Sequence, residues 1–118
     1  MECILDSIKK LLGIQPQYTA FDDDIKIHIN TVLVILYQMG VGPKDGFMIV
    51  AGDEVWSDYC TKQNENAVKT FVYLKVKLMF DPPTSSVLLE SINRTLTELE
   101  WRLYVDAENN TEGGDISG

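Results

Sequence analysis

The most constraining feature of the sequence lies in residues 67–105, where two apolar runs flank the adjacent prolines Pro82 and Pro83. Neither proline has an N–H group to donate, and each disfavours helical geometry in the residue before it. A helix in the first run must therefore end near Phe80. The hydroxyl side chains at positions 84–86 then suit the cap of a second helix. This stretch predicts two antiparallel helices joined by a proline hinge.

The second of these helices carries one apolar stripe and further apolar residues away from it. The stripe recurs at steps of three and four residues, as one face of a helix requires: Leu88, Ile92, Leu96, Leu99 and Leu103. Leu89, Trp101, Tyr104 and Val105 lie off this stripe. A small monomer would leave them uncovered, so they indicate a surface for a partner.

The first helix of the pair, which we expect to begin near Asn64 or Asn66, is apolar around nearly its whole circumference. A helix of that kind is expected to be surrounded by others. Its exceptions are Lys69, Lys75 and Lys77. Their long stems can lie on apolar surface while the ammonium groups reach water or acids, and the other interpretation is that they bind nucleic acid.

Two more helices are expected before this pair. Residues 3–12 form a short amphipathic run that Gly13 ends, and a linker at 14–18 follows. Thr19 is suited to cap the next helix, whose first turn holds three aspartates at 22–24. Consecutive helical residues point about 100° apart, so these carboxylates favour the helix dipole over a shared cation. The run ends at Gly40 and is expected to be central to the core.

Residues 42–63 lack the helical periodicity of the flanking segments, and their pattern predicts an extended loop or a short hairpin. Four large side chains lie in this excursion: Phe47, Ile49, Trp56 and Tyr59. They either fold back on the helices or meet another protein, and folding back is the expected outcome. The fold class predicted is all-α: a small four-helix bundle with this excursion and an extended C-terminal tail.

The overall charge and the C-terminal residues limit the functions that this chain can have. The net charge is −8, and the last thirteen residues contribute four acids and no base. Such a surface repels nucleic acid as a whole. Residues 107–118 have a composition typical of disorder, so we expect a helical domain over 1–106 and an extended acidic tail over 107–118.

The sequence lacks the patterns that enzymes and metal sites need. No Gly-rich phosphate loop, His-carboxylate pattern or Gly-x-Ser-x-Gly is present, and the single histidine, His28, has no partner motif. We therefore expect no enzyme activity, metal or cofactor. Cys3 and Cys60 are expected to be reduced thiols in a cytoplasmic protein, and no apolar run is long enough for a membrane span.

Several segments resemble the head-tail connector (adaptor) proteins of long-tailed bacteriophages. The main one spans residues 68–86 and reads Val-Lys-Thr-Phe-Val-Tyr-Leu-Lys-Val-Lys-Leu-Met-Phe-Asp-Pro-Pro-Thr-Ser-Ser; Ser-Ile-Asn-Arg and Glu-Leu-Glu-Trp-Arg-Leu continue it. The opening Ile-Leu-Asp-Ser-Ile-Lys-Lys-Leu-Leu-Gly-Ile, the helix around His-Ile-Asn, Gly-Val-Gly-Pro and a later Trp-Ser-Asp are similar as well. Together they cover most of residues 1–105.

The resemblance implies a structural protein of the virion neck, assembled in the cytoplasm of the host bacterium. Its partners would be about a dozen copies of itself in a ring, the portal protein above, and a stopper or tail-completion protein below. The ring would extend the channel and lie near double-stranded DNA without binding it specifically. The alternative function is a soluble DNA-packaging or regulatory helper that binds nucleic acid or the terminase.

Three groups of residues are candidates for these contacts. Leu89, Trp101 and Tyr104 are predicted for the ring interface. The excursion residues Phe47, Ile49, Trp56 and Tyr59 are predicted to face the stopper or tail. The portal-binding tail would comprise Ala107, Glu108, Asn109, Asn110, Thr111, Glu112, Asp115 and Ile116.

Overall fold

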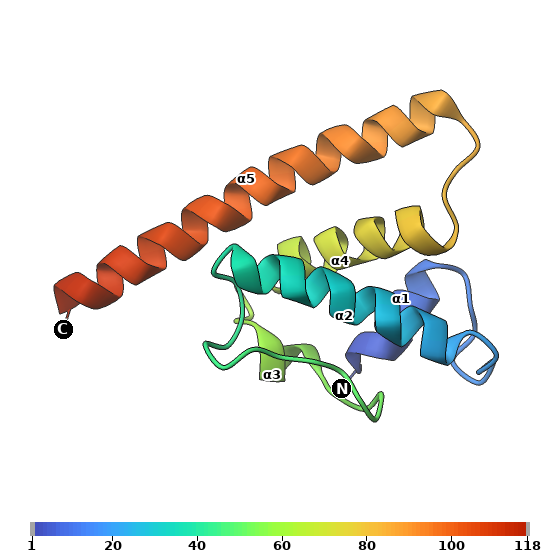
Figure 1. The fold of residues 1–118 in the computed structure, drawn as a ribbon, viewed down its shortest axis with the longest axis horizontal. Helices are drawn as coiled ribbons and strands as arrows, with labels where there is room; N and C mark the ends of the chain where they lie inside the picture. The colour runs from blue at the N-terminus through green and yellow to red at the C-terminus, as the bar shows by residue number, and fades with distance from the viewer. Residues whose placement is uncertain (1, 118) are drawn as a thin grey trace.

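The structure, a computed structural model, describes the backbone of residues 2–117 and the side chains of residues 2–108. Within that part of the chain it contains helices and no strand, so the predicted small all-α fold is confirmed. The helices are α1 (Ile4–Leu11), α2 (Asp22–Gln38), α3 (Trp56–Tyr59), α4 (Glu65–Phe80) and α5 (Ser86–Ser117). The single turn α3 lies within the long connection between α2 and α4 (Figure 1).

Helix α4 is the centre of the bundle. It contacts α1, α2 and α5, and in Figure 1 it lies between α2 and α5. Four of its side chains are fully buried: Val68, Phe71, Val72 and Val76. Burial of a side chain of this size stabilises the fold by roughly 1.5–3 kcal/mol. The expectation that this apolar helix is surrounded by others is confirmed.

The proline hinge returns α5 across α4. Helix α4 ends at Phe80, where the backbone N–H of Asp81 makes a last bond to the carbonyl of Lys77. The side-chain oxygen of Ser85 accepts a hydrogen bond from the backbone N–H of Leu88 at 3.2 Å, which caps the start of α5. The predicted stripe of α5 is buried at Ile92, Leu96 and Leu103, half-buried at Leu99 and exposed at Leu88.

A buried lysine fixes the connection between α1 and α2. Lys9 is fully buried, and its ammonium donates to the carbonyl oxygens of Pro16 at 2.9 Å and Tyr18 at 2.8 Å. The same ammonium lies 2.7 Å from Oδ1 of Asp22. The cation therefore holds both ends of the linker and the first residue of α2.

These three contacts of Lys9, which we call the Lys9 clasp, explain why the prediction of Thr19 as the N-cap of α2 is wrong. The helix begins at Asp22 after Phe21, and no side chain caps it. Thr19 contributes its carbonyl to a turn with the N–H of Asp22, and its hydroxyl has no capping role. With the linker held by Lys9, the helix begins two residues later than it would if Thr19 capped it.

For residues 42–63 the sequence predicts an extended loop or a short hairpin, and the structure has the loop; an isolated bridge joins Val55 to Cys3. The prediction for the tail is corrected. The backbone of residues 107–117 is helical, where the sequence predicts an extended tail. Each residue added to an existing helix closes another backbone hydrogen bond without a new nucleation cost, and this segment contains no proline. The division of the chain at residue 106 stays a prediction.

We predict that Lys9→Met lowers the free energy of unfolding by about 2–4 kcal/mol, because it leaves Asp22 and two carbonyl groups without their cation. Urea denaturation followed by circular dichroism measures this loss. Lys10→Met is the matched control, since Lys10 is exposed and its substitution should change stability by less than about 0.5 kcal/mol. Equal effects of the two substitutions would contradict the importance of the clasp.

Candidate functional site: interaction surfaces

Two of the predicted ring-interface residues form an exposed apolar surface on α5. Trp101 is 67% exposed, opposite the buried stripe, and Tyr104 is 50% exposed at the flank of that stripe. Together with Thr97, Glu100 and Met39, which directly follows α2, they line a shallow pocket of about 320 Å³. This pocket is open to a side chain from another molecule.

The third predicted residue of the ring interface does not join this surface. Leu89 is partly exposed, but it precedes Trp101 by twelve residues. On a helix this spacing corresponds to about 18 Å along the axis and about 120° around it. Leu89 belongs with Val87 and Leu88, which are also exposed, near the start of α5.

The predicted portal-binding residues continue α5 beyond the bundle. Ala107 is half-buried and packs against the core, at a point where a Cβ placed on Gly40 would lie 3.4 Å from the Ala107 Cβ. Glu108 is exposed. The remaining side chains predicted for this role lie outside the described residues: Asn109, Asn110, Thr111, Glu112, Asp115 and Ile116.

The large side chains of the excursion fold back onto the helices. Ile49, Trp56 and Tyr59 are buried, and Phe47 is half-buried with its ring 5.2 Å from that of Tyr59. The preference for folding back is confirmed. The contact between these four residues and a stopper or tail protein stays a prediction, and within the chain Phe47 is the least buried of them. Met48 and Val50, which alternate with them, are exposed instead.

Polar side chains of the helices hold the excursion in place. The Asn30 amide of α2 accepts a hydrogen bond from the N–H of Ile49 at 2.8 Å and donates one to the Ile49 carbonyl at 2.9 Å. It supplies the donor and the acceptor that a neighbouring strand would offer, which is why no hairpin is needed. On α1, the Ser7 hydroxyl accepts a hydrogen bond from the Trp56 indole N–H at 2.8 Å.

Glu54 closes the turn at the tip of the excursion. Its carboxylate accepts hydrogen bonds from the backbone N–H groups of Val50, Ala51 and Gly52, at 2.7 to 3.3 Å. Burial alone would raise the pKa of Glu54, but these N–H groups outweigh it and lower the pKa below its ordinary value of 4.5. The tip is therefore a defined, charge-stabilised turn. Sequence reasoning missed Asn30, Ser7 and Glu54, because none of them belongs to a recognised local motif.

The two cysteines are free thiols with little nucleophilic character. Burial, reinforced by the nearby Glu65 carboxylate and opposed by Lys69, raises the pKa of Cys60 to about 11. Burial also raises the pKa of Cys3. A thiol with a raised pKa is mostly protonated at neutral pH, which disfavours a nucleophilic role for either cysteine.

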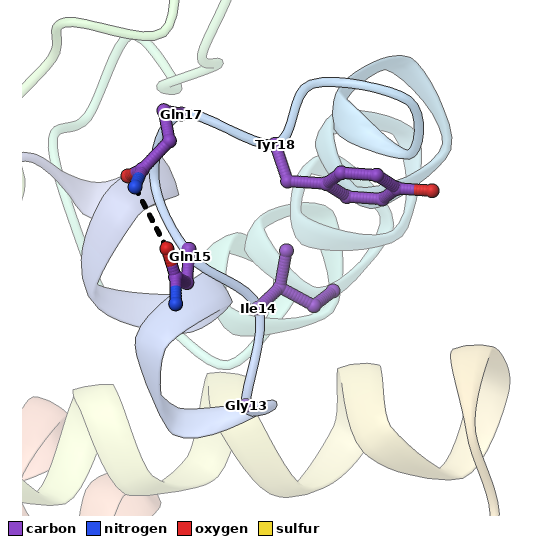
Figure 2. Close-up of a pocket in the computed structure, with 5 residues that line it drawn as sticks. All are labelled: Gly13, Ile14, Gln15, Gln17 and Tyr18. Atoms are coloured by element: carbon purple, nitrogen blue, oxygen red, sulfur yellow. Dashed lines mark hydrogen bonds between the residues drawn. The ribbon is translucent and has the colours of Figure 1, made fainter.

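A second open pocket, of about 450 Å³, lies against the linker between α1 and α2. In Figure 2 the amides of Gln15 and Gln17 are joined by a hydrogen bond of 2.7 Å, while Ile14 and Tyr18 lie on the other side of the linker. Gly13 completes the lining. No ionisable acid or base lines this pocket apart from the Tyr18 phenol, so it offers surface for contact rather than groups for catalysis.

The lysines that suggested nucleic-acid binding are engaged within the chain. Lys69 lies 3.8 Å from the Glu2 carboxylate and over the ring of Trp56, and Lys75 lies over the ring of Phe71. The Lys77 ammonium is 3.4 Å from the Asp81 carbonyl. The interpretation that their stems lie on apolar surface is consistent with these contacts.

Neither a metal site nor a membrane span is found in the described part of the chain. No group of three or more histidine, cysteine or acidic side chains is placed to hold a metal ion. None of the helices in the described part of the chain combines the length and the apolar character of a membrane span.

Fold and surfaces together define a small all-helical protein that presents apolar side chains from its last long helix and from the tip of a loop. The family model described as phage connector protein matches residues 4–110, so the chain belongs to the phage connector family. This is a family of structural proteins, whose members interact with other head and tail proteins at the virion neck. Comparison with curated proteins and with solved structures found no significant match.

We predict that Glu54→Gln lowers the free energy of unfolding by about 1 kcal/mol at neutral pH, since three hydrogen bonds to a partly exposed charge are weakened. The native pKa of this carboxyl is depressed, so its contribution is present above pH 4.5 and is lost as the pH falls through the lower native value. Urea unfolding of both proteins between pH 7 and pH 3 should show the difference closing towards the acid end. Asp53→Asn, which removes the neighbouring exposed carboxylate that accepts none of these three hydrogen bonds, is the control.

Proposed function

We propose that this protein forms a ring beneath the capsid portal, joins head to tail and extends the channel through which DNA passes. The ring would hold about a dozen copies related by rotation. The portal lies above it and a stopper or tail-completion protein below, in a neck assembled in the host cytoplasm. The protein has a structural role in this proposal and no catalytic one.

The observation that carries the proposal is the exposure of Trp101 and Tyr104 on a chain of the connector family. Large aromatic residues are enriched at the centres of protein interfaces, where each can bury roughly 150–250 Å². Trp101 opposite the buried stripe of α5 and Tyr104 at its flank are both exposed, so they can contact another subunit while the bundle stays intact.

The C-terminal end of α5 is the proposed portal contact. In Figure 1 this end extends beyond the other helices. Residues 106–118 carry four acids and no base, which suits a basic or dipolar groove on a larger partner. Because every copy in a ring would present the same segment, weak individual contacts would add up through avidity.

The tip of the excursion is the proposed contact for the protein below. Met48 and Val50 are the exposed apolar residues of this segment, and we add them to the side chains first predicted for this contact. Asn30 holds the backbone of Ile49 between them, and Glu54 accepts a hydrogen bond from the N–H of Val50. Such a preformed tip loses little conformational entropy on binding.

The alternative of a nucleic-acid-binding helper gains no support from these surfaces. Lys69, Lys75 and Lys77 interact with groups of the same chain, and the net charge of −8 opposes approach to phosphates. An acidic ring fits a channel that DNA traverses without adhering. A gel-shift assay at low salt tests this choice, because the helper function requires a retarded band and the connector does not.

We predict that removal of residues 109–118 weakens attachment to assembled portal by about tenfold or more, because every copy loses its proposed contact. The truncation keeps Ala107, which packs against the core, so circular dichroism and the melting temperature should stay as in the full chain. Binding to purified portal, followed by electron microscopy of the product, measures the effect. Glu112→Gln with Asp115→Asn, in the full chain, separates the role of charge from that of length. Full-strength attachment of the truncated protein would refute the portal assignment.

A further inference from the structure

The outward face of α2 is a second exposed apolar surface, which the sequence analysis did not identify. Ile27 is 62% exposed and Val34 is 52% exposed. They are seven residues apart with exposed Thr31 between them, so the three lie on one face over two turns. The opposite face of α2 is buried in the core.

One pair of opposite charges can join this face to the outward face of α5, which carries the acids Glu90 and Glu108 as well as Arg94. Asp23 and Asp24 are exposed at the start of α2, and neither forms a salt bridge within the described residues. Both arginines of the chain lie on α5. Arg94 shares the face of Trp101, two turns earlier, and its ion pair with Glu90 is long, at 3.8 Å, and exposed.

The spacing of these residues along the two helices is compatible with direct contact between the two faces. Arg94 precedes Trp101 by seven residues, or about 10 Å. On α2, Ile27 and Val34 follow Asp23 by about 6 Å and about 16 Å. If Arg94 lies beside Asp23 and Asp24 in a parallel arrangement, Trp101 falls between the two aliphatic side chains.

The parallel direction agrees with the arrangement within one chain. In Figure 1 helices α2 and α5 both run from right to left, inclined to one another, and α4 runs the opposite way. Rotation about an axis along these helices keeps their direction, so α5 of one copy would meet α2 of the next in parallel. Because the two faces differ, the contact is heterologous and can repeat from copy to copy.

We infer that the outward face of α2 binds the outward face of α5 of a second copy, with Ile27 and Val34 around Trp101 and Asp23 or Asp24 paired with Arg94. This inference rests on the proposed function and names the complementary surface of the ring. Each copy then adds three helices, α2, α4 and α5, to a continuous row. The pocket beside Trp101 receives an aliphatic side chain of the neighbour.

The contact is weak when only two copies meet. A stable interface usually buries about 800 Å² on each partner. Two aromatic rings that are already one-third to one-half covered supply only a part of this area, and an exposed ion pair contributes little. The experiment must therefore detect weak association.

The decisive test combines two full-length variants, each defective in one face. Trp101→Glu removes the α5 face, and Ile27→Glu with Val34→Glu removes the α2 face; all three positions are exposed, and circular dichroism should confirm the fold. Each variant alone should stay monomeric in sedimentation up to about millimolar concentration, a range suited to weak encounters. Their mixture should form a 1:1 dimer, because one intact face of each kind remains. Isotope-labelled Trp101→Glu protein should show chemical-shift changes along the outward face of α2 when the other variant is added.

Charge reversal tests the polar part of the contact. Arg94→Asp, placed in the variant that keeps the α5 face, should weaken its association with the variant that keeps the α2 face. The expected loss is about two- to fivefold, the range for an exposed ion pair. Asp23→Arg with Asp24→Arg in the other subunit should restore the association. Arg102→Asp is the matched control, because Arg102 points about 100° away from Trp101 and pairs with Glu98.

Two results would overturn the inference: a mixture of the variants that stays monomeric and shows no shifts on α2, or association of either variant alone that equals the wild type. These outcomes are distinct from failure of the proposed function. A ring in the virion neck built on other faces would refute only the α2–α5 contact. Absence of the protein from purified necks, with the α2–α5 dimer observed, would refute only the connector role.

Discussion

The burial of α4 is the interaction on which the rest of the structure depends. Helices α1, α2 and α5 all pack on it, and its core is built from small and branched side chains around Phe71. Because α4 is covered on several sides, α2 and α5 each bury one stripe against it and turn the opposite face outward. The exposed apolar surfaces of the protein are thus a consequence of a central helix with partners on different sides.

Sequence patterns identified this arrangement where helices bury long stripes. The proline pair places the end of α4 and the cap of α5 at Ser85, and the apolar circumference of α4 indicates its central position. Periodicity was less informative for short helices. In α1 the apolar periodicity gave no sign that Lys9 is buried, because that burial depends on contacts with Pro16 and Tyr18 of the linker. No local pattern contains those partners.

The excursion between α2 and α4 shows a second limit of sequence reasoning. Its sequence left an extended loop and a short hairpin open, and in the structure a single amide on α2 satisfies both backbone groups of Ile49. A polar residue within a helix gives no sign of which distant backbone it will bind. The same applies to α5 beyond residue 106, where composition typical of disorder lies in a continuous helix because the preceding turns had already nucleated it.

Weak binding through the outward faces of α2 and α5 is also what a protein needs if its copies are to associate only on the portal. A chain with strongly adhesive faces would polymerise before reaching its partner, since a heterologous contact can repeat without limit. A net charge of −8 adds repulsion between free copies. On a portal, attachment of the C-terminal ends would raise the local concentration of the copies, so that contacts too weak for solution become sufficient to close a ring. Modest exposed surface on α2 and α5 is therefore consistent with a connector that assembles only where its template is present.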